Sequence, residues 1–197
     1  MLTRPLPFMR ACTVLVTAGR HTGPMDNDLV VLLDEHRQPS GTMPKADVHG
    51  ADTPLHLAFS VYVFDGDGRL LVTRRALDKQ TWPGVWSNSC CGHVRPDEVP
   101  AKAARRRLME ELSLVPSTLE LALPDFAYRA TSPEGVVENE VCPVFTARVD
   151  HDPVGNPDEV SQWEWASWAS FRDLAATAPW AVSPWAALQA PLLPAHP

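Results

Sequence analysis

The sequence predicts a single domain of the α/β (α+β) class. Two observations support this prediction: short apolar, strand-like runs recur along the chain, and one helical segment lies among them. The chain has 197 residues, of which 45% are hydrophobic and 21% are charged. This length and composition are typical of a globular domain with one substantial core.

The expected domain spans residues 25–189. Residues 1–24 are expected to form a mobile extension, because prolines and glycines interrupt them. Residues 190–197 contain three prolines and are expected to be a flexible tail.

Strands are expected in order along the domain, the first beginning at about Leu29. A hairpin follows, in which residues 55–64 and 69–74 are joined by a turn at residues 65–68, whose glycines allow the positive φ of a tight turn. Further strands are expected at residues 126–131, 136–149 and 162–166.

One helix is expected between these strands, at residues 97–112. Asp97 is a suitable N-cap, because its carboxylate can accept a hydrogen bond from the first turn. Pro100 lies in that turn, where its missing N–H costs no hydrogen bond.

Charge and cysteine content narrow the class of protein. The formal net charge of −7 argues against a general nucleic-acid or anionic-membrane binder. No apolar stretch reaches the ~18 residues that span a bilayer and we identify no signal peptide, so we expect a cytoplasmic protein. The four cysteines, Cys12, Cys90, Cys91 and Cys142, follow no disulfide framework and suit a reducing compartment.

A segment rich in glycine, proline and tryptophan, residues 81–93, places the thiol of Cys91 two residues from the imidazole of His93. Such a segment is a poor core strand and a suitable active-site wall. Cys90 is expected to be an inert, apolar neighbour of a free Cys91 thiol.

Two glutamates mark a candidate metal site. Glu138 and Glu140 lie two residues apart in a strand-like run, so both carboxylates point to one face, where a cation offsets their repulsion. Three imidazoles complete the candidate set: His93, His56, which points away from the apolar face of its strand, and His49, seven residues earlier. These ligands suit zinc, manganese or iron rather than calcium. The alternative is a solvated His49, a hydrogen-bonded His56 and a solvated strand face bearing the glutamates.

Long motifs of the chain resemble a known family. The similar segments follow in order between about residue 29 and about residue 185, at residues 49–56, 70–77, 82–93, 128–131, 137–145 and 179–185. They resemble type I isopentenyl-diphosphate delta-isomerase, a member of the Nudix-fold superfamily. The resemblance implies a Nudix fold, in which a mixed sheet is flanked by helices. It also implies an isomerase that interconverts isopentenyl and dimethylallyl diphosphate, in isoprenoid precursor biosynthesis.

The resemblance also implies catalytic roles. Adding a proton to an alkene carbon and removing another from the tertiary carbocation needs an acid and a base on opposite faces. The resemblance assigns these positions to Cys91 and Glu140, and leaves open which of them protonates first. It implies that Tyr128 hydrogen-bonds Glu140 and that the indole of Trp185 stabilises the cation. One divalent ion, Mn²⁺ or Zn²⁺, is implied at the His/Glu site.

Basic residues are implied at the diphosphate end of the substrate, namely Lys45, Arg75, Lys79 and Arg107. The resemblance gives Glu111 and the main-chain carbonyl of Cys91 as ligands of a Mg²⁺ that accompanies the diphosphate. Taken singly, each basic residue is better interpreted as a solvated surface charge, and only together do they indicate a basic pocket. The expected partner is a small diphosphate; the oligomeric state stays open, and a monomer is compatible with the sequence.

The expected helix and the residues before it resemble the Nudix box at Gly92, Glu98, Arg106, Leu108, Glu110 and Glu111. Arg107 departs from the box, because a nucleotide-hydrolysing member carries glutamate there, and Ser113 replaces the usual glycine. Losing a carboxylate makes metal-dependent pyrophosphate hydrolysis less favourable. A Nudix pyrophosphohydrolase and a catalytically silent Nudix-fold binding module remain as alternatives to the isomerase. Another alternative is that both arginines merely form i,i+4 pairs on a surface helix.

Overall fold

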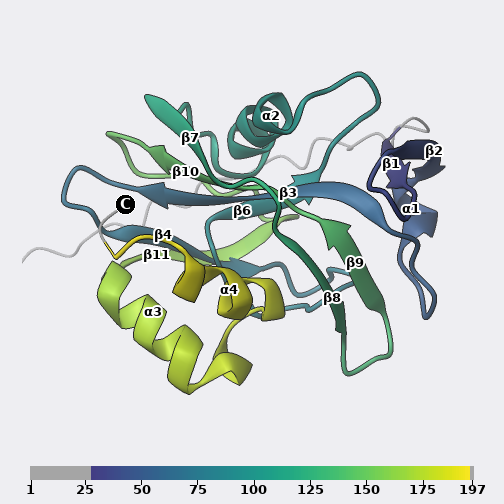
Figure 1. Cartoon of the computed structure of the whole chain (residues 1–197). Coiled ribbons are helices and arrows are strands. Elements are labelled where there is room, and N and C mark those ends of the chain that lie inside the picture. The colour runs from purple at the N-terminus through teal and green to yellow at the C-terminus, as the bar shows by residue number, and fades with distance from the viewer. Residues whose placement is uncertain (1–27, 196–197) are drawn as a thin grey trace, which may run out of the picture.

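The fold is taken from a computed structural model, which describes residues 28–195. The mobile extension expected at residues 1–24 lies outside the described residues. Eleven strands form a mixed sheet, with helix α2 (Pro100–Leu112) on one face and helices α3 (Trp168–Thr177) and α4 (Pro184–Gln189) on the other (Figure 1). This architecture confirms the predicted class, a mixed sheet flanked by helices.

The remaining elements follow the chain in order. They are β1 (Leu29–Leu33), β2 (Pro39–Pro44), α1 (Lys45–Val48), β3 (His56–Phe64), β4 (Leu70–Arg75), β5 (Trp86–Ser87), β6 (Cys90–His93), β7 (Thr118–Leu123), β8 (Ala127–Thr131), β9 (Val137–Val141), β10 (Val144–Arg148), β11 (Val160–Ala166), η1 (Pro179–Ala181) and η2 (Ala190–Leu192). Among residues 28–195, no helix combines the length and the apolar character needed to cross a membrane.

Strand β3 is the centre of the sheet, and both of its faces are buried. Phe59, Val61 and Val63 pack under α2, whereas Tyr62 and Phe64 pack under α3 and α4. This division follows from the two-residue period of a strand, which sends alternate side chains to opposite faces.

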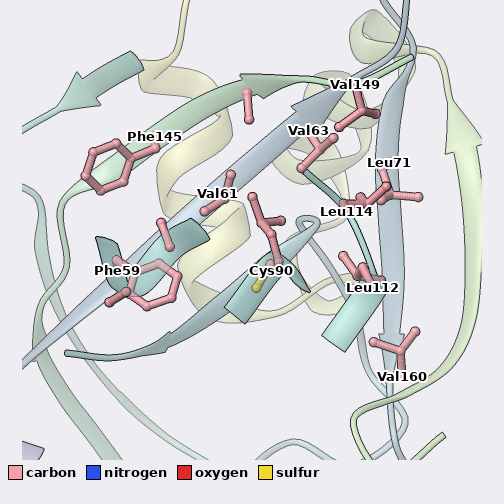
Figure 2. Packing of buried hydrophobic residues seen from close by; sticks show 14 of the residues in the cluster. Phe59, Val61, Val63, Leu71, Cys90, Leu112, Leu114, Phe145, Val149 and Val160 are labelled. Atoms are coloured by element: carbon pink, nitrogen blue, oxygen red, sulfur yellow. The ribbon is translucent and has the colours of Figure 1, made fainter. Parts of the chain in front are cut away.

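Two apolar clusters hold the helices on the sheet. Figure 2 shows the cluster on the α2 side, where Leu112, Leu114 and Cys90 lie among side chains of β3, β4 and β10. The second cluster places Trp168 and Phe171 of α3 against the opposite face. Each large apolar side chain buried in this way contributes about 1.5–3 kcal/mol to stability.

The hairpin predicted at residues 55–74 is formed, but its strands pair only next to the turn, through Phe64 and Leu70. Ser89 lies between the two strands further along. Its hydroxyl accepts a hydrogen bond from the N–H of Val63 at 2.7 Å and donates one to the carbonyl of Leu71 at 2.6 Å. Strand β6 therefore replaces β4 as the neighbour of β3, and the segment expected to be a poor strand contributes a strand to the sheet.

The strand predicted at residues 136–149 is divided into two. Cys142 and Pro143 separate β9 from β10, because a proline cannot donate a ladder hydrogen bond. The N–H of Ser60 instead donates to the carbonyl of Pro143 at 3.1 Å. Both halves pair with β3 in parallel, β9 at its start and β10 along its remainder.

The predicted N-cap of the helix is wrong. Helix α2 begins at Pro100 with Val99 as the capping residue and no side-chain cap, and Asp97 has a positive φ of 62°. The Glu98 carboxylate, which accepts from the N–H of Arg95 at 3.2 Å, organises this turn instead. The cap prediction failed because Glu98 folds the chain back before the helix starts.

The chain after residue 189 is packed further than the expected tail. Ala190 is fully buried and Leu193 is 2% exposed, both in the cluster beside α3. The indole N–H of Trp168 also donates to the carbonyl of Pro194 at 2.9 Å. The apolar side chain of Leu193 thus fixes a proline-rich segment whose composition suggested fraying.

Candidate active site

Strand register brings distant side chains to one face of the sheet. On β3, Ser60 lies opposite Cys91 and His56 lies opposite Glu140. Ala58, midway between these two β3 residues, lies opposite His93. Residues directly opposite each other share a face, as do residues two apart on one strand. Cys91, His93, His56 and Glu140 therefore meet on the face that α4 covers.

The five candidate metal ligands converge. Ligand atoms of His49, His56, His93, Glu138 and Glu140 all lie within 4.8 Å of one another. The three imidazole ring centres are 5.0–5.3 Å apart. The side chains come from three strands and from the turn after α1, so the sheet rather than a local motif assembles the cluster.

The orientation of these groups suits a shared cation. His49 Nε2 lies 2.9 Å from Glu138 Oε2, yet neither buried atom has a hydrogen-bond partner among the described residues. His56 bonds the carbonyl of Pro54 through Nδ1 at 2.9 Å, which leaves its buried Nε2 facing the cluster. Buried polar atoms without partners are costly. Three imidazoles and two carboxylates form a donor set that zinc or manganese would satisfy.

Protonation states in the cluster depend on burial and on its opposite charges. Burial alone would raise the pKa of Glu140, but the imidazoles of His56 and His93, 3.4 Å and 3.5 Å away, hold this pKa well below its usual value. Burial lowers the pKa of His93. Glu140 is therefore a carboxylate at neutral pH.

One cavity of about 80 Å³ adjoins this cluster. It is lined by all the residues for which the resemblance implied catalysis or diphosphate binding, namely Cys91, Glu140, Tyr128, Trp185, Lys45, Arg75, Lys79, Arg107 and Glu111. His93 and Glu138 also line it. Two lining residues, Ser60 and Glu159, were missed at the sequence level.

The Cys91 thiol has two polar neighbours, Ser60 Oγ and Asn88 Oδ1, each 3.3 Å from its sulfur. Burial raises the pKa of Cys91 to about 12, so the sulfur keeps its proton at neutral pH. Cys90 points to the opposite face, into the cluster under α2. Ser60 and Asn88 were missed because nothing in a small polar residue of a strand or loop indicates which thiol it will contact.

Trp185 forms an apolar wall and is 3% exposed. The ring centre of Tyr128 is 6.0 Å from that of Trp185, and Arg75 Cζ lies 5.4 Å above the same indole. No hydrogen bond joins Tyr128 to Glu140 in the described structure, in contrast to the contact that the resemblance implied. The Glu140 carboxylate is directed to His56 and His93 instead.

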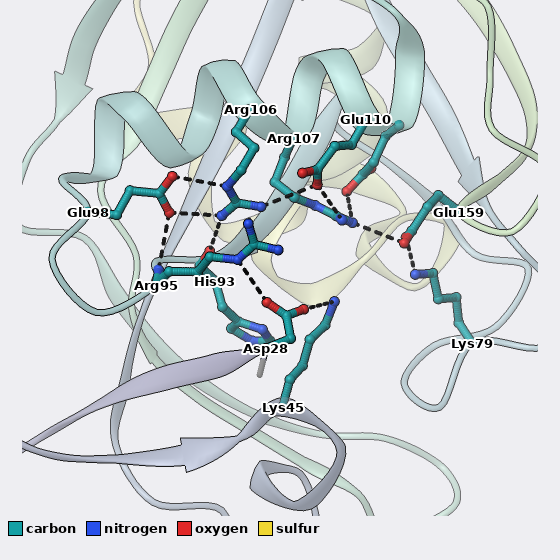
Figure 3. Close-up of polar contacts among 11 residues, drawn as sticks. Asp28, Lys45, Lys79, His93, Arg95, Glu98, Arg106, Arg107, Glu110 and Glu159 are labelled. Atoms are coloured by element: carbon teal, nitrogen blue, oxygen red, sulfur yellow. Dashed lines mark hydrogen bonds and ion pairs between the residues drawn. The ribbon is translucent and has the colours of Figure 1, made fainter. Parts of the chain in front are cut away.

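Three basic residues of the cavity, Lys45, Lys79 and Arg107, are paired with carboxylates rather than solvated, whereas Arg75 donates to the carbonyl of Thr81. Figure 3 shows Glu159 between Lys79 and Arg107, with its Oε1 3.1 Å from Arg107 Nη2. Lys45 Nζ lies 3.6 Å from Asp28. Glu159 was missed because its only sequence-level feature was its place just before a predicted strand.

Arg107 also makes the ion pair with Glu111 that a helix spacing of four residues allows. Burial opposes its charge, but Glu111 and Glu159 raise its pKa above the usual value. A Cβ added to Gly92 would lie 3.3 Å from Arg107 Cγ and 3.3 Å from Phe59. The glycine thus leaves room for the arginine to pass the edge of β6 and reach the cavity.

Arg106 serves a different purpose from its neighbour. Its guanidinium donates to the Glu98 carboxylate at 2.8 Å and 3.0 Å and to the carbonyl of His93 at 3.3 Å. The pair with Glu110, at 3.2 Å, is the weaker contact at the helix surface. Arg106 therefore ties α2 to the strand that carries Cys91 and His93.

Comparisons with known proteins extend the geometric findings. A model of the NUDIX domain family matches residues 54–188. A protein of Frankia alni named isopentenyl-diphosphate Delta-isomerase is 62% identical over 159 residues, which cover 81% of this chain and 82% of the relative. A protein of the same name from Clavibacter sepedonicus is 55% identical over 88% of this chain and 92% of its own. The MutT protein structure from Methanosarcina mazei has a similar fold, with a TM-score of 0.55 at 19% identity over 70% of this chain and 91% of that chain.

Proposed function

The chain belongs to the NUDIX domain family and, within it, to the isopentenyl-diphosphate Delta-isomerases, and from this premise we infer how its cavity acts. The enzyme interconverts isopentenyl diphosphate and dimethylallyl diphosphate, a step of isoprenoid precursor biosynthesis. The observation that carries the proposed mechanism is one cavity lined by a thiol, a carboxylate, an indole and four basic side chains.

We propose that Cys91 and Glu140 transfer the two protons. They stand on β6 and β9, which flank β3, so they can approach a bound alkene from different sides. Cys91 holds a proton at neutral pH because burial raises its pKa to about 12, whereas Glu140 is ionised and can accept one. The pair thus contains one group able to donate and one able to accept, as an allylic double-bond shift requires.

The tertiary carbocation between the two transfers needs electron density without a nucleophile. The indole of Trp185, which is 3% exposed, supplies a π face, and a cation–π contact with a desolvated ring is worth about 2 kcal/mol or more. The ring is fixed by its contacts with Trp82 and Tyr128, at centre distances of 5.5 Å and 6.0 Å. We assign Tyr128 to this wall, beside Glu140.

The diphosphate is proposed to bind Lys45, Arg75, Lys79 and Arg107. The cavity of about 80 Å³ is smaller than the ~300 Å³ or more of typical ligand sites, so side chains must move when substrate enters. We propose that the diphosphate replaces Glu159 as the anionic partner of Arg107 and Lys79. Glu111 and the Cys91 carbonyl would then hold the Mg²⁺ that accompanies the diphosphate.

His49, His56, His93, Glu138 and Glu140 are proposed to hold one divalent ion, Mn²⁺ or Zn²⁺. When bound, this ion offsets the repulsion between the two carboxylates and tunes the proton affinity of Glu140. The ligand residues themselves keep the carboxylate at one edge of the cavity, beside Tyr128.

Incubating the purified chain with isopentenyl diphosphate, Mg²⁺ and Mn²⁺ tests the proposal directly. We expect dimethylallyl diphosphate and no released phosphate or pyrophosphate. Released phosphate would indicate a pyrophosphohydrolase, which the arginine at position 107 disfavours. Substrate binding without either product would indicate a silent binding module.

A further inference from the structure

The side-chain oxygen of Asn88 is a shared acceptor beneath the cavity. It accepts hydrogen bonds from Ser87 Oγ at 2.9 Å, from the indole N–H of Trp185 at 3.0 Å and from the Cys91 thiol at 3.3 Å. Asn88 is 1% exposed and does not itself line the cavity. One buried oxygen thus links a proton-transfer residue to the wall that faces the carbocation.

The orientation of the Asn88 amide is fixed by its other end. Its nitrogen donates to the carbonyl of Val61 at 3.0 Å and to the carbonyl of Cys90 at 3.2 Å. Carbonyl oxygens only accept and an indole N–H only donates. A flipped amide would therefore turn its oxygen to the two carbonyls and its N–H group to the indole N–H, and would lose all three hydrogen bonds. The oxygen of Asn88 must therefore point to Trp185 and Cys91.

Helix α4 also contacts the other polar neighbour of the thiol, Ser60, through a residue one turn after Trp185. Gln189 Nε2 donates to Ser60 Oγ at 3.0 Å, and Ser60 Oγ lies 3.3 Å from the Cys91 sulfur. The Tyr62 hydroxyl donates a hydrogen bond to the side-chain oxygen of Gln189 at 3.2 Å. Because Trp185 and Gln189 are four residues apart, they lie on one face of the helix. Both polar neighbours of the thiol are thereby anchored to the same short helix.

We propose that Asn88 is a positioning residue, which sets the Cys91 thiol and the Trp185 indole relative to each other by accepting a hydrogen bond from both. The proposal rests on the proposed isomerase mechanism, since only there do these two groups act on one intermediate. Loss of the shared oxygen leaves the thiol with Ser60 and the indole with Ser87 as the remaining partner, so no single group links the two. Misplacement of a reacting group by about 1 Å can lower a rate about 100-fold.

Two substitutions separate positioning from folding. Asn88→Ala removes both the acceptor and the donor, whereas Asn88→Asp keeps an acceptor oxygen toward Trp185 and Cys91 and places a second oxygen, in place of the N–H donors, against the carbonyls of Val61 and Cys90. We expect both variants to melt at lower temperature than the wild type. We expect kcat to fall about 10- to 100-fold in Asn88→Ala with little change in KM, and to fall less in Asn88→Asp.

A matched control is Ser87→Ala. Ser87 shares the indole N–H with Asn88, at 3.0 Å, but makes no hydrogen bond to the thiol. The variant removes a neighbouring buried hydroxyl while the link from Asn88 to Cys91 remains. Its loss in kcat should be smaller than that of Asn88→Ala.

A second readout does not depend on turnover. In ¹⁵N–¹H spectra, the indole N–H peak of Trp185, identified by its disappearance in Trp185→Phe, should shift in Asn88→Ala and stay closer to its wild-type position in Asn88→Asp. Folded Asn88→Ala with wild-type kcat, or equal losses of kcat in the Ala and Asp variants, would overturn the proposal. A wild-type chain without isomerase activity would instead overturn the proposed function. The shift of the indole peak in Asn88→Ala would still report the hydrogen bond between Trp185 and Asn88.

Discussion

The carboxylate of Glu159 lies 3.1 Å from the guanidinium of Arg107 and joins the residue before β11 to helix α2. The other carboxylate oxygen contacts Lys79. Two basic side chains proposed to bind the diphosphate are therefore held in place by an anion of the chain itself. Both side chains already have an anionic partner before substrate arrives, so the diphosphate has an internal competitor, Glu159, to displace.

Arg107→Ala should chiefly raise KM for isopentenyl diphosphate. A hydrogen bond to a charged group contributes about 1.5–3 kcal/mol, which corresponds to an increase of about 10- to 100-fold. Steady-state kinetics would measure it. Arg105→Ala is the matched control, because Arg105 lies on the same helix but donates to the carbonyl of Pro116. Equal KM values for the two variants would contradict the diphosphate role of Arg107.

Glu159→Gln should change how stability depends on pH. Burial would raise the pKa of Glu159, but Arg107 and Lys79 lower it to about 2. Because the folded pKa lies below the usual value of 4.5, the carboxylate stabilises the fold above about pH 4.5 and loses this effect as the pH falls toward 2. The difference in unfolding free energy between wild type and variant should therefore shrink over this range. A constant difference measured by denaturant unfolding would refute the assigned ion pair.

Removal of the divalent ion should lower the melting temperature by about 5–10 °C, because an ion at 100 times its Kd contributes about 2.7 kcal/mol. Chelation followed by calorimetry measures the loss, and added Mn²⁺ or Zn²⁺ should restore the original value. Glu138→Gln should reduce bound metal, whereas Glu134→Gln, on the exposed turn before β9, should not. Full metal content in Glu138→Gln would remove this residue from the ligand set.

Cys91→Ala and Glu140→Gln should each lower kcat by about 100- to 10,000-fold while the fold is retained. Bound metal must be measured for Glu140→Gln, because this residue is also a proposed ligand. Cys90→Ala is the internal control: its thiol packs under α2, on the face away from the cavity. An active Cys91→Ala enzyme, or equal losses in the two cysteine variants, would make the proposed proton transfer untenable.

Ser113→Gly should stabilise the chain by about 1 kcal/mol and raise the melting temperature by about 2–4 °C. Ser113 follows α2 with a φ of 56°, a left-handed conformation that favours glycine. The same exchange at Ser170, inside α3, should destabilise instead, since helical glycine is unfavourable. Thermal unfolding compares the two, and a lower melting temperature for Ser113→Gly would contradict the expected strain.

The amino-acid pattern alone predicts which side chains are available for chemistry and to which face of a strand they point. The alternation in residues 56–64 separates the apolar residues under α2 from His56 and Ser60 on the opposite face, because a strand has a period of two. The spacing of Glu138 and Glu140 likewise sets both carboxylates on one side of β9. These features depend on local geometry alone, so no knowledge of the remaining chain is needed.

Which strand faces meet depends on the order of the strands in the folded sheet. The insertion of Ser89 between β3 and β4 makes β6 the neighbour of β3, and so brings Cys91 to the site. The contacts of Glu159 with Arg107 and of Asn88 with Trp185 join residues 52 and 97 positions apart. A carboxylate or amide shows no such partner in its own segment, because its partner depends on strand order and register, which the whole sheet determines.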